Sequence, residues 1–245
     1  MPNIDIYTTT ALAPSKEKNL AKRASYFENH YIPYLRDFWV FKQWNKCIEL
    51  GCWQWHKLEK LIKAFPETEF CGLDNSSEML GKAKSRLPGI ELNIWNILNL
   101  NDISDSSADN VCLFQVLHHL DADQRKKAYG EILRILKPYW YIIVIDSFRP
   151  EDSKAKQLIW DSVNRFYAVL SQHSAESLSI RTKEAICSIL MPSRYDPESY
   201  WYFSPTRKSV FWDGYPELEL VALITPKVLS GTIKCISDMM IFQKK

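Results

Sequence analysis

Residues 47–61 of the chain read CIELGCWQWHKLEKL, and this stretch decides how the fold is interpreted. A short apolar run ends in an acid and a glycine, and a helical pattern follows within a few residues. A strand that turns so sharply into a helix is typical of a cofactor loop, because glycine permits a positive φ and a close approach of the backbone to a ligand. Trp53 and Trp55 stand inside this turn, where a bulky side chain is unfavourable.

Short apolar runs and helical patterns alternate along the chain on both sides of this stretch. Strands are expected at 46–50, 69–74, 90–97, 109–117 and 141–147, and helices at 55–65, 76–87 and 121–136. This alternation predicts an α/β fold with a doubly wound, mostly parallel sheet that has helices on both faces. The runs 218–225 and 237–243 predict a C-terminal antiparallel hairpin, which brings the sheet to seven strands.

The rest of the chain is expected to complete a single domain over residues 1–245. Helical spacing recurs through residues 15–43, and Pro33 is expected to divide that stretch into two helices. The predicted parts are an N-terminal helical cap (1–43), a cofactor-binding core (44–147), a substrate-lid insertion (148–212) and the closing hairpin (213–245).

Composition excludes several classes of function. The net charge is +2, from 31 Lys and Arg against 29 Asp and Glu, so no nucleic-acid partner is expected. The six cysteines form no CxxC pair, which favours reduced thiols in a cytoplasmic protein and no metal site. The longest apolar run, YWYIIVI, is too short to span a bilayer, and no signal peptide is expected. A small-molecule substrate is expected, and the oligomeric state is left open.

The order of these pieces resembles the class I S-adenosylmethionine-dependent methyltransferases, whose sheet is Rossmann-like. The family's acid-x-Gly-x-Gly-x-Gly pattern falls on Glu49, Gly51, Trp53 and Trp55. Asp74 matches the family's acid that binds the ribose, and Trp95-Asn96 matches its Gly-Asp pair near the adenine. The segment FQVLHHL (114–120) is similar to the segment that lines the methionine end of the cofactor, and Trp140 stands at the second glycine of the family's Lys-Pro-Gly-Gly.

The resemblance implies S-adenosylmethionine as cofactor and transfer of its methyl group to a small molecule. The cofactor-binding residues it implies are Glu49, Gly51, Cys52, Trp53, Asp74, Asn75, Met79, Asn96, Ile97 and Gln115. No catalytic residue is assigned, because the chemistry mainly requires the acceptor to be held in line with the methyl group. His118 or His119 could serve as a general base, but the favoured interpretation is that one of them packs and the other lines the pocket or the start of the helix. The alternative to ribose binding by Asp74 is a favourable interaction of its carboxylate with the dipole of the following helix.

The tryptophans leave two explanations open. The chain has 7 glycines and 9 tryptophans, whereas ordinary composition predicts about 17 glycines in this length. In the first explanation, the chain is a catalytically inactive descendant, namely a binding protein whose cofactor loop is plugged by indoles. In the second, its gene uses UGA for glycine and has been read with a code in which UGA means tryptophan. The tryptophans taken together with the glycines would restore an ordinary glycine content.

Overall fold

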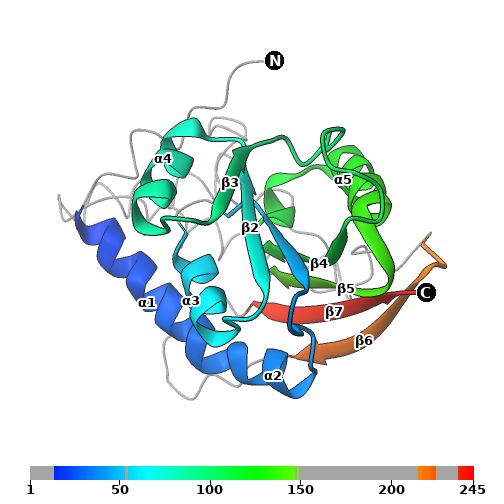
Figure 1. Cartoon of the computed structure of the whole chain (residues 1–245), viewed down its shortest axis with the longest axis horizontal. Coiled ribbons are helices and arrows are strands. Elements are labelled where there is room, and N and C mark those ends of the chain that lie inside the picture. The colour runs from blue at the N-terminus through cyan, green and yellow to red at the C-terminus, as the bar shows by residue number, and fades with distance from the viewer. Residues whose placement is uncertain (1–13, 53–54, 147, 149–214, 225–236) are drawn as a thin grey trace, which may run out of the picture.

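The computed structural model describes residues 14–52, 55–146, 148, 215–224 and 237–245 (Figure 1). Two helices open the described chain, α1 (Pro14–His30) and α2 (Ile32–Asp37). They are separated at Tyr31, with Pro33 in the first turn of α2, where a missing N–H costs the helix no hydrogen bond. The predicted division by Pro33 is therefore confirmed. The predicted substrate lid (148–212) lies, apart from Phe148, outside the described residues.

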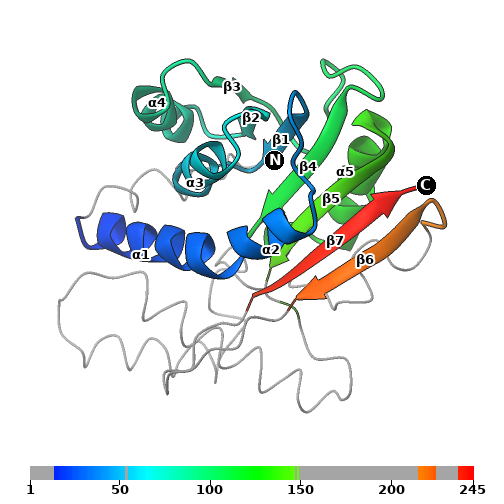
Figure 2. The same cartoon turned by 60° about the horizontal axis from the view of Figure 1, so that its bottom comes forward.

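Seven strands form one sheet, as predicted. They are β1 (Lys46–Leu50), β2 (Glu69–Asp74), β3 (Glu91–Ile94), β4 (Ala108–Phe114), β5 (Leu136–Asp146), β6 (Leu218–Ile224) and β7 (Asp238–Lys244). Their order in the sheet is β3-β2-β1-β4-β5-β7-β6. The first five strands are parallel, whereas β7 runs antiparallel to both β5 and β6 (Figure 2). The carboxyl ends of β1, β2 and β4 therefore meet at one edge, where ligands bind in open α/β sheets.

Helices cover both faces of the sheet. The remaining helices are α3 (His56–Ala64), α4 (Ser77–Arg86), α5 (Ala122–Ile135) and the short 3-10 helix η1 (Leu117–His119). Buried side chains of α1, α2, α3 and α4 form one core cluster with the sheet, and α5 contributes to a second. Figures 1 and 2 show α5 on the opposite side of the sheet from α3. A sheet covered in this way requires nearly all-apolar strands, and every residue of β4 is buried.

Side-chain caps fix where two helices begin. The Ser76 hydroxyl accepts a hydrogen bond from the N–H of Met79 at the start of α4. At the start of α5, Asp121 accepts from the N–H of Gln124, and the Gln124 side chain accepts from the N–H of Asp121. This reciprocal pair is a capping box, which satisfies backbone donors that the first helical turn leaves without partners.

Three strand boundaries differ from the prediction by more than one residue. β5 begins at Leu136 instead of residue 141, because Leu136 pairs with Ala108 before a register shift that pairs Asn110 with Tyr141. The irregularity accommodates the chain that includes Pro138, which cannot donate to a ladder. β3 ends at Ile94 and β4 at Phe114, earlier than predicted. The apolar residues beyond these ends belong to turns that pack on the core.

The cysteines of the described chain are buried free thiols: Cys47, Cys52, Cys71 and Cys112. The Sγ atoms of Cys47 and Cys112 lie 3.5 Å apart on neighbouring strands, and burial raises the pKa of both thiols. Within the described ranges, no group of three His, Cys, Asp or Glu side chains is arranged to hold a metal ion. Among the helices described, none has the length and apolar character needed to cross a membrane.

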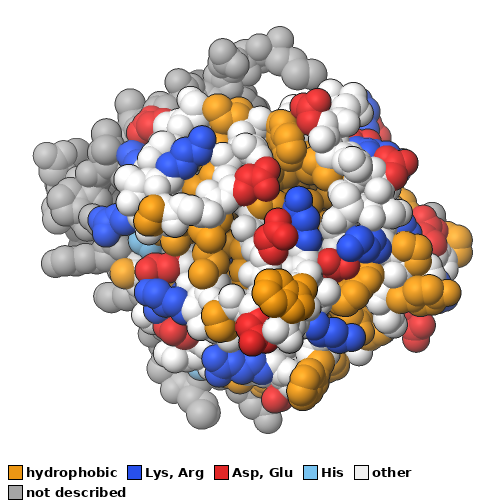
Figure 3. Space-filling model, in the orientation of Figure 1, with side chains coloured by type: hydrophobic (Ala, Val, Ile, Leu, Met, Phe, Trp, Pro, Cys, Tyr) orange, Lys and Arg blue, Asp and Glu red, His pale blue; other side chains and the backbone are white. Residues whose placement is uncertain are grey.

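Lysine and arginine side chains intermingle with acidic ones on the face shown in Figure 3, so the described part of that face presents no large patch of one charge. This arrangement matches the near-zero net charge of the sequence.

Candidate cofactor site

The turn after β1 is held against the end of β2 by two backbone hydrogen bonds. The N–H groups of Gly51 and Cys52 both donate to the carbonyl of Leu73, at 2.7 and 3.0 Å. Gly51 has φ +73°, and a β-carbon at this position would lie 2.7 Å from Cγ2 of Val116. Glycine is therefore required here both by the backbone conformation and by the close approach of the segment after β4.

Trp55 occupies the N-cap position of α3 in the left-handed conformation, with φ 59°. Its side chain is 8% exposed and packs in the core cluster on the helix side of the sheet, with the Arg86 guanidinium 5.9 Å from the ring centre. The Trp55 indole therefore lies in the hydrophobic core and is not the plug of a cofactor loop. The predicted contact of Trp53 with the cofactor falls outside the described residues.

Asp74 ends β2 at the carboxyl edge of the sheet, as its predicted role requires. It is 7% exposed, and its Oδ1 accepts a hydrogen bond from the N–H of Ser76 at 2.9 Å. The carboxylate thus also supports the turn into α4, the structural role considered as the alternative. Asn75 is exposed beside it, whereas Met79 is fully buried in the first turn of α4.

The turn after β3 lies beside Asp74. The N–H of Trp95 donates to the carbonyl of Asp74 at 3.0 Å. Asn96 is exposed, and its side-chain oxygen accepts from the N–H of Leu98 at 2.9 Å, while Ile97 is half-buried. The structure therefore brings Asp74, Asn96 and Ile97 together, as the resemblance implied.

Arg134 of α5 holds the segment that follows this turn. Its guanidinium donates to the carbonyls of Leu100 and Ile103, each at 2.8 Å, and pairs with Glu131 and Asp105. Glu131 also accepts a hydrogen bond from the N–H of Leu100 at 2.7 Å. These bonds fix the chain leading away from Asn96 against the rigid helix.

Gln115 follows β4 at the same edge and adopts φ 65°. Its N–H donates to the carbonyl of Ile145 at 2.7 Å, and its side-chain amide donates to the hydroxyl of Ser237 at 2.9 Å. Gln115 therefore lies between the ends of β4 and β5 and the chain that enters β7. This position is close to the Gly51 turn, since the next residue, Val116, packs against Gly51.

The two histidines after β4 have different surroundings. His118 is buried, and its Nδ1 lies 2.7 Å from Oδ1 of Asp146 at the end of β5. The rings of His118 and His119 are 4.0 Å apart. Burial and the neighbouring His118 hold the pKa of His119 well below its usual value, so His119 is neutral at pH 7. His118 is therefore the member of the pair that packs in the core, whereas His119 is half-buried.

Glu49, which is buried, and Lys57, which is half-buried, lie close enough behind the turn for each to shift the pKa of the other. Glu49 is 2% exposed, and its Oε2 has no hydrogen-bond partner among the residues that the structure describes. Burial raises the pKa of Glu49, although the charge of Lys57 partly opposes this. Burial likewise lowers the pKa of Lys57, which Glu49 partly opposes. Each charge is therefore costly in the protein alone.

Sequence reasoning missed Lys57. Its ammonium group donates to the carbonyl of Phe114 at 3.1 Å and lies 5.8 Å from the centre of the Phe114 ring. A lysine among the polar positions of an amphipathic helix is ordinarily solvated, so its residue type gave no signal. Its place in the first turn of the helix that follows the glycine loop could have indicated a position close to the cofactor site.

These residues fit the charged amino-acid end and the ribose of S-adenosylmethionine. The buried Glu49 oxygen lacks a partner within the described chain, and an ammonium group would supply one. Gly51 lets the turn adopt a positive φ while Val116 packs closely against it. Asp74 provides a carboxylate at the end of the neighbouring strand, where ribose hydroxyls are bound in related sheets.

Comparison with known proteins agrees with this geometry. The fold is that of the class I methyltransferases: one solved relative, a SAM-dependent methyltransferase from Methanosarcina mazei, has a TM-score of 0.57 and 19% identity over 85% of this chain and 96% of its own. A protein from Pyrococcus horikoshii has a TM-score of 0.61 and 16% identity, with 98% of each chain covered. Residues 48–139 match the family model described as a methyltransferase domain. Residues 48–139 therefore match a methyltransferase domain, on a fold that a solved SAM-dependent methyltransferase shares.

Curated relatives are similar over a shorter stretch. A trans-aconitate 2-methyltransferase from an Acidovorax strain is 42% identical over 43 residues, which are 18% of this chain and 17% of that protein. One from Rhodopseudomonas palustris is 40% identical over 53 residues, or 20% of this chain and 21% of that protein. The matched part thus spans only about a fifth of the length of these relatives.

Proposed function

We propose that this protein transfers a methyl group from S-adenosylmethionine to a small-molecule acceptor. The observation that carries the proposal is the buried Glu49 carboxylate, which lies behind a turn where Gly51 cannot accept a side chain. This arrangement belongs to a region that matches a methyltransferase domain. A buried acid without a partner in the described protein is expected to serve a bound group.

Each residue of the edge has a role in this proposal. Asp74 accepts hydrogen bonds from the ribose hydroxyls, and Asn96 and Ile97 line the adenine. Glu49 and Gln115 hold the amino-acid end, and the Gly51 turn passes under it. When bound, the cofactor supplies an electrophilic methyl group, and the protein contributes orientation and exclusion of water.

The acceptor proposed for the first trial is trans-aconitate, since the curated relatives are named for its methylation. The similarity to these relatives covers only part of either chain, so other small carboxylates belong in the same trial. The net charge of +2 and the mixed surface charge favour such small acceptors over nucleic acid.

Isothermal calorimetry with S-adenosylhomocysteine, followed by transfer of labelled methyl groups to a panel of carboxylates, tests the proposal. Binding is expected, with loss of affinity in Asp74→Ala and none in Asp102→Ala, which changes an exposed acid. If neither the printed chain nor a Trp53→Gly/Trp55→Gly version binds, the chain is not an active methyltransferase, and the binding-protein alternative takes its place.

A further inference from the structure

Lys57 lies where three elements meet. Its ammonium group contacts the carbonyl and ring of Phe114, the last residue of β4. The Phe114 ring in turn packs against Phe27 of α1, with ring centres 5.2 Å apart. One turn further along α3, Lys60 pairs with Glu28 of α1. The face of α3 that carries Lys57 is therefore turned toward α1 and the carboxyl end of β4.

Within the described part of the chain, the contacts of Lys57 leave its charge without an anionic partner. A carbonyl accepts one hydrogen bond from an ammonium group that has three to donate. Among the described residues, Lys57 forms no ion pair with a distance of 4.0 Å or less. Glu49 and Asp146 are near enough to raise the pKa of Lys57, whereas Arg23 adds a second positive charge that lowers this pKa.

The pair of Glu49 and Lys57 therefore has the form of a receptor for a ligand with both charges. The carboxylate of Glu49 has an unused acceptor within the described chain, and Lys57 has unused donor capacity. A buried charge is stabilised when a ligand supplies its counter-charge and hydrogen bonds. We propose that Lys57 is a carboxylate-binding residue at the carboxyl edge of the sheet, near the ammonium-binding Glu49. This inference rests on the proposed function.

The carboxylate bound by Lys57 comes either from the amino-acid end of the cofactor or from the acceptor. Binding of two cofactor analogues distinguishes the cofactor from the acceptor as the source of this carboxylate. S-adenosylhomocysteine carries the carboxylate and the ammonium, and its decarboxylated form, S-adenosyl-3-thiopropylamine, carries only the ammonium. Tricarballylate serves as a carboxylate probe without an adenosyl group.

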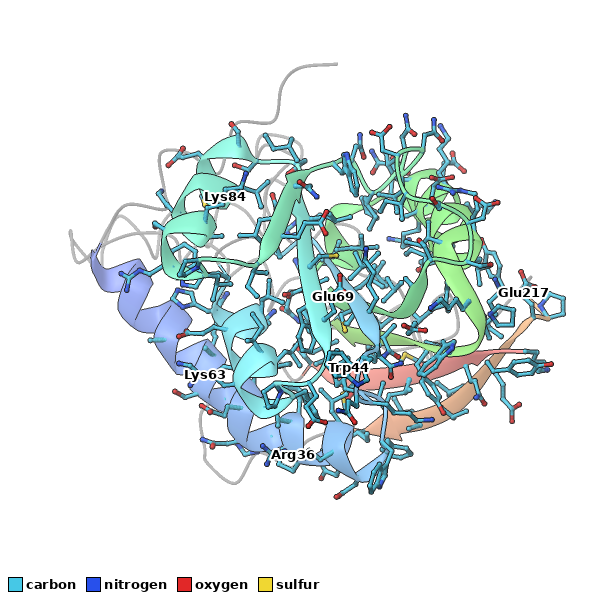
Figure 4. The ribbon with its side chains drawn as sticks, viewed as in Figure 1. Arg36, Trp44, Lys63, Glu69, Lys84 and Glu217 are labelled. Carbon is cyan, nitrogen blue, oxygen red and sulfur yellow. The ribbon has the colours of Figure 1, made fainter. Side chains whose placement is uncertain are left out.

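The experiment compares Lys57→Met with a control, Lys63→Met, which removes an exposed lysine two turns further along α3. Both variants are made in the full-length protein, with and without the double change Trp53→Gly/Trp55→Gly. Figure 4 labels Lys63 on this helix. If Lys57 binds the cofactor carboxylate, Lys57→Met lowers S-adenosylhomocysteine affinity at least tenfold and leaves the decarboxylated form unaffected. If it binds the acceptor, S-adenosylhomocysteine affinity is retained and tricarballylate binding is lost. Lys57→Arg, which keeps the charge, restores part of either loss.

Equal affinities of Lys57→Met and Lys63→Met for all three probes overturn the assignment. Failure of the proposed function looks different, because no version of the protein then binds S-adenosylhomocysteine. In that case tricarballylate alone decides: binding that depends on Lys57 supports the site, and absence of binding overturns it as well.

A second inference follows from the backbone and is independent of the first. Three tryptophans adopt left-handed conformations: Trp39 with φ 51°, Trp44 with φ 62° and Trp55 with φ 59°. The other tryptophans of the described chain, Trp95 and Trp140, do not. Positive φ is uncommon for any residue with a side chain, and for a bulky residue it is a genuine outlier.

The local geometry at these positions is that of glycine. Trp39 follows the C-cap of α2, and its N–H donates to the carbonyl of Arg36 at 3.0 Å, a pattern that helices usually complete with a left-handed glycine. Trp44 stands in the turn before β1, with its N–H bonded to the carbonyl of Glu67. The side chains of Trp39 and Trp44 are 74% and 82% exposed, so packing explains neither indole. Figure 4 labels Trp44.

We infer that the gene specifies glycine at positions 39, 44 and 55, through UGA codons that its source organism reads as glycine. Nucleotide sequencing of these codons and mass spectrometry of the peptides from the native protein test this directly. UGA codons with glycine-containing peptides are expected. UGG codons at these positions, or tryptophan in the native peptides, would overturn the inference.

Discussion

Nδ1 of His118 lies 2.7 Å from Oδ1 of Asp146, and both side chains are buried. The same carboxylate accepts hydrogen bonds from the N–H groups of Leu117, at 2.9 Å, and His118, at 3.3 Å. Asp146 thus joins the end of β5 to η1, the 3-10 helix that follows β4. Because Gln115 and Val116 precede η1 directly, this contact also fixes the segment that packs on the Gly51 turn.

Replacing Asp146 with Ala is expected to reduce the free energy of unfolding by about 1–3 kcal/mol, because buried donors lose their acceptor. Urea unfolding measures the loss. The control is Asp105→Ala, which removes an acid whose side chain is 75% exposed, and it should have a small effect. Unchanged stability together with loss of methyl transfer would instead show that the pair acts in catalysis.

Replacing Asp74 with Ala is expected to weaken binding of S-adenosylhomocysteine by roughly 1.5–3 kcal/mol, the range for hydrogen bonds to a charged group. Calorimetry measures the change in dissociation constant. Circular dichroism checks that the domain still folds, since Asp74 also supports the turn at Ser76. An unchanged dissociation constant in the folded variant would rule out ribose binding by Asp74.

The double change Trp53→Gly/Trp55→Gly is expected to strengthen cofactor binding, because glycine makes the positive φ at position 55 nearly free. Thermal melts with and without S-adenosylhomocysteine compare the two proteins. A larger cofactor-induced rise in melting temperature is expected for the glycine version, since a ligand that binds the native state stabilises it. The same rise in both proteins would mean that the tryptophans are compatible with the site.

Trp39→Gly and Trp44→Gly are each expected to stabilise the protein or leave it unchanged. Relief of a left-handed conformation is worth on the order of 1 kcal/mol, and the exposed indoles contribute little packing. Trp140→Gly is the matched control, because Trp140 lacks a positive φ and packs against the core. Chemical unfolding should separate the first two variants from the third. Equal destabilisation in all three would contradict the assignment of strain to Trp39 and Trp44.

Glu49→Gln is expected to make the stability of the ligand-free protein less dependent on pH. Burial raises the pKa of Glu49, so the folded state holds a proton that the unfolded state releases. By linkage, this group lowers stability as pH rises from about 4 toward neutrality. Thermal melts across that range should show a steeper decline for the parent than for Glu49→Gln. Parallel curves would mean that Glu49 ionises normally in the folded protein.

The sheet could be predicted from sequence because its strands are apolar on both faces and its helices carry clear start and stop signals. The apolar run of β4 and the capping residues Ser76 and Asp121 illustrate this. Glu49 and Asp74 were identified because they stand at strand ends where the resemblance places cofactor ligands. Their burial was not visible in the sequence.

The environment of Lys57 could not be predicted, since it depends on the approach of α1 to the end of β4. The same holds for Ser237, which contacts Gln115 from 122 residues further along the chain. The early start of β5 was also missed, because a register shift lets Pro138 lie within a strand. Local patterns specify elements, whereas these features arise from contacts between distant segments.

The position of β7 between β5 and β6 has a consequence for synthesis of the protein. A ribosome releases β6 before β7, yet among the described strands β6 pairs with β7 alone. Until β7 emerges, β6 has no ladder to join, and the edge of β5 keeps its backbone donors and acceptors uncovered. Exposed strand edges of this kind recruit other chains. The nascent protein therefore passes through a stage in which its central strands are vulnerable to aggregation, and protection by a chaperone would matter most there.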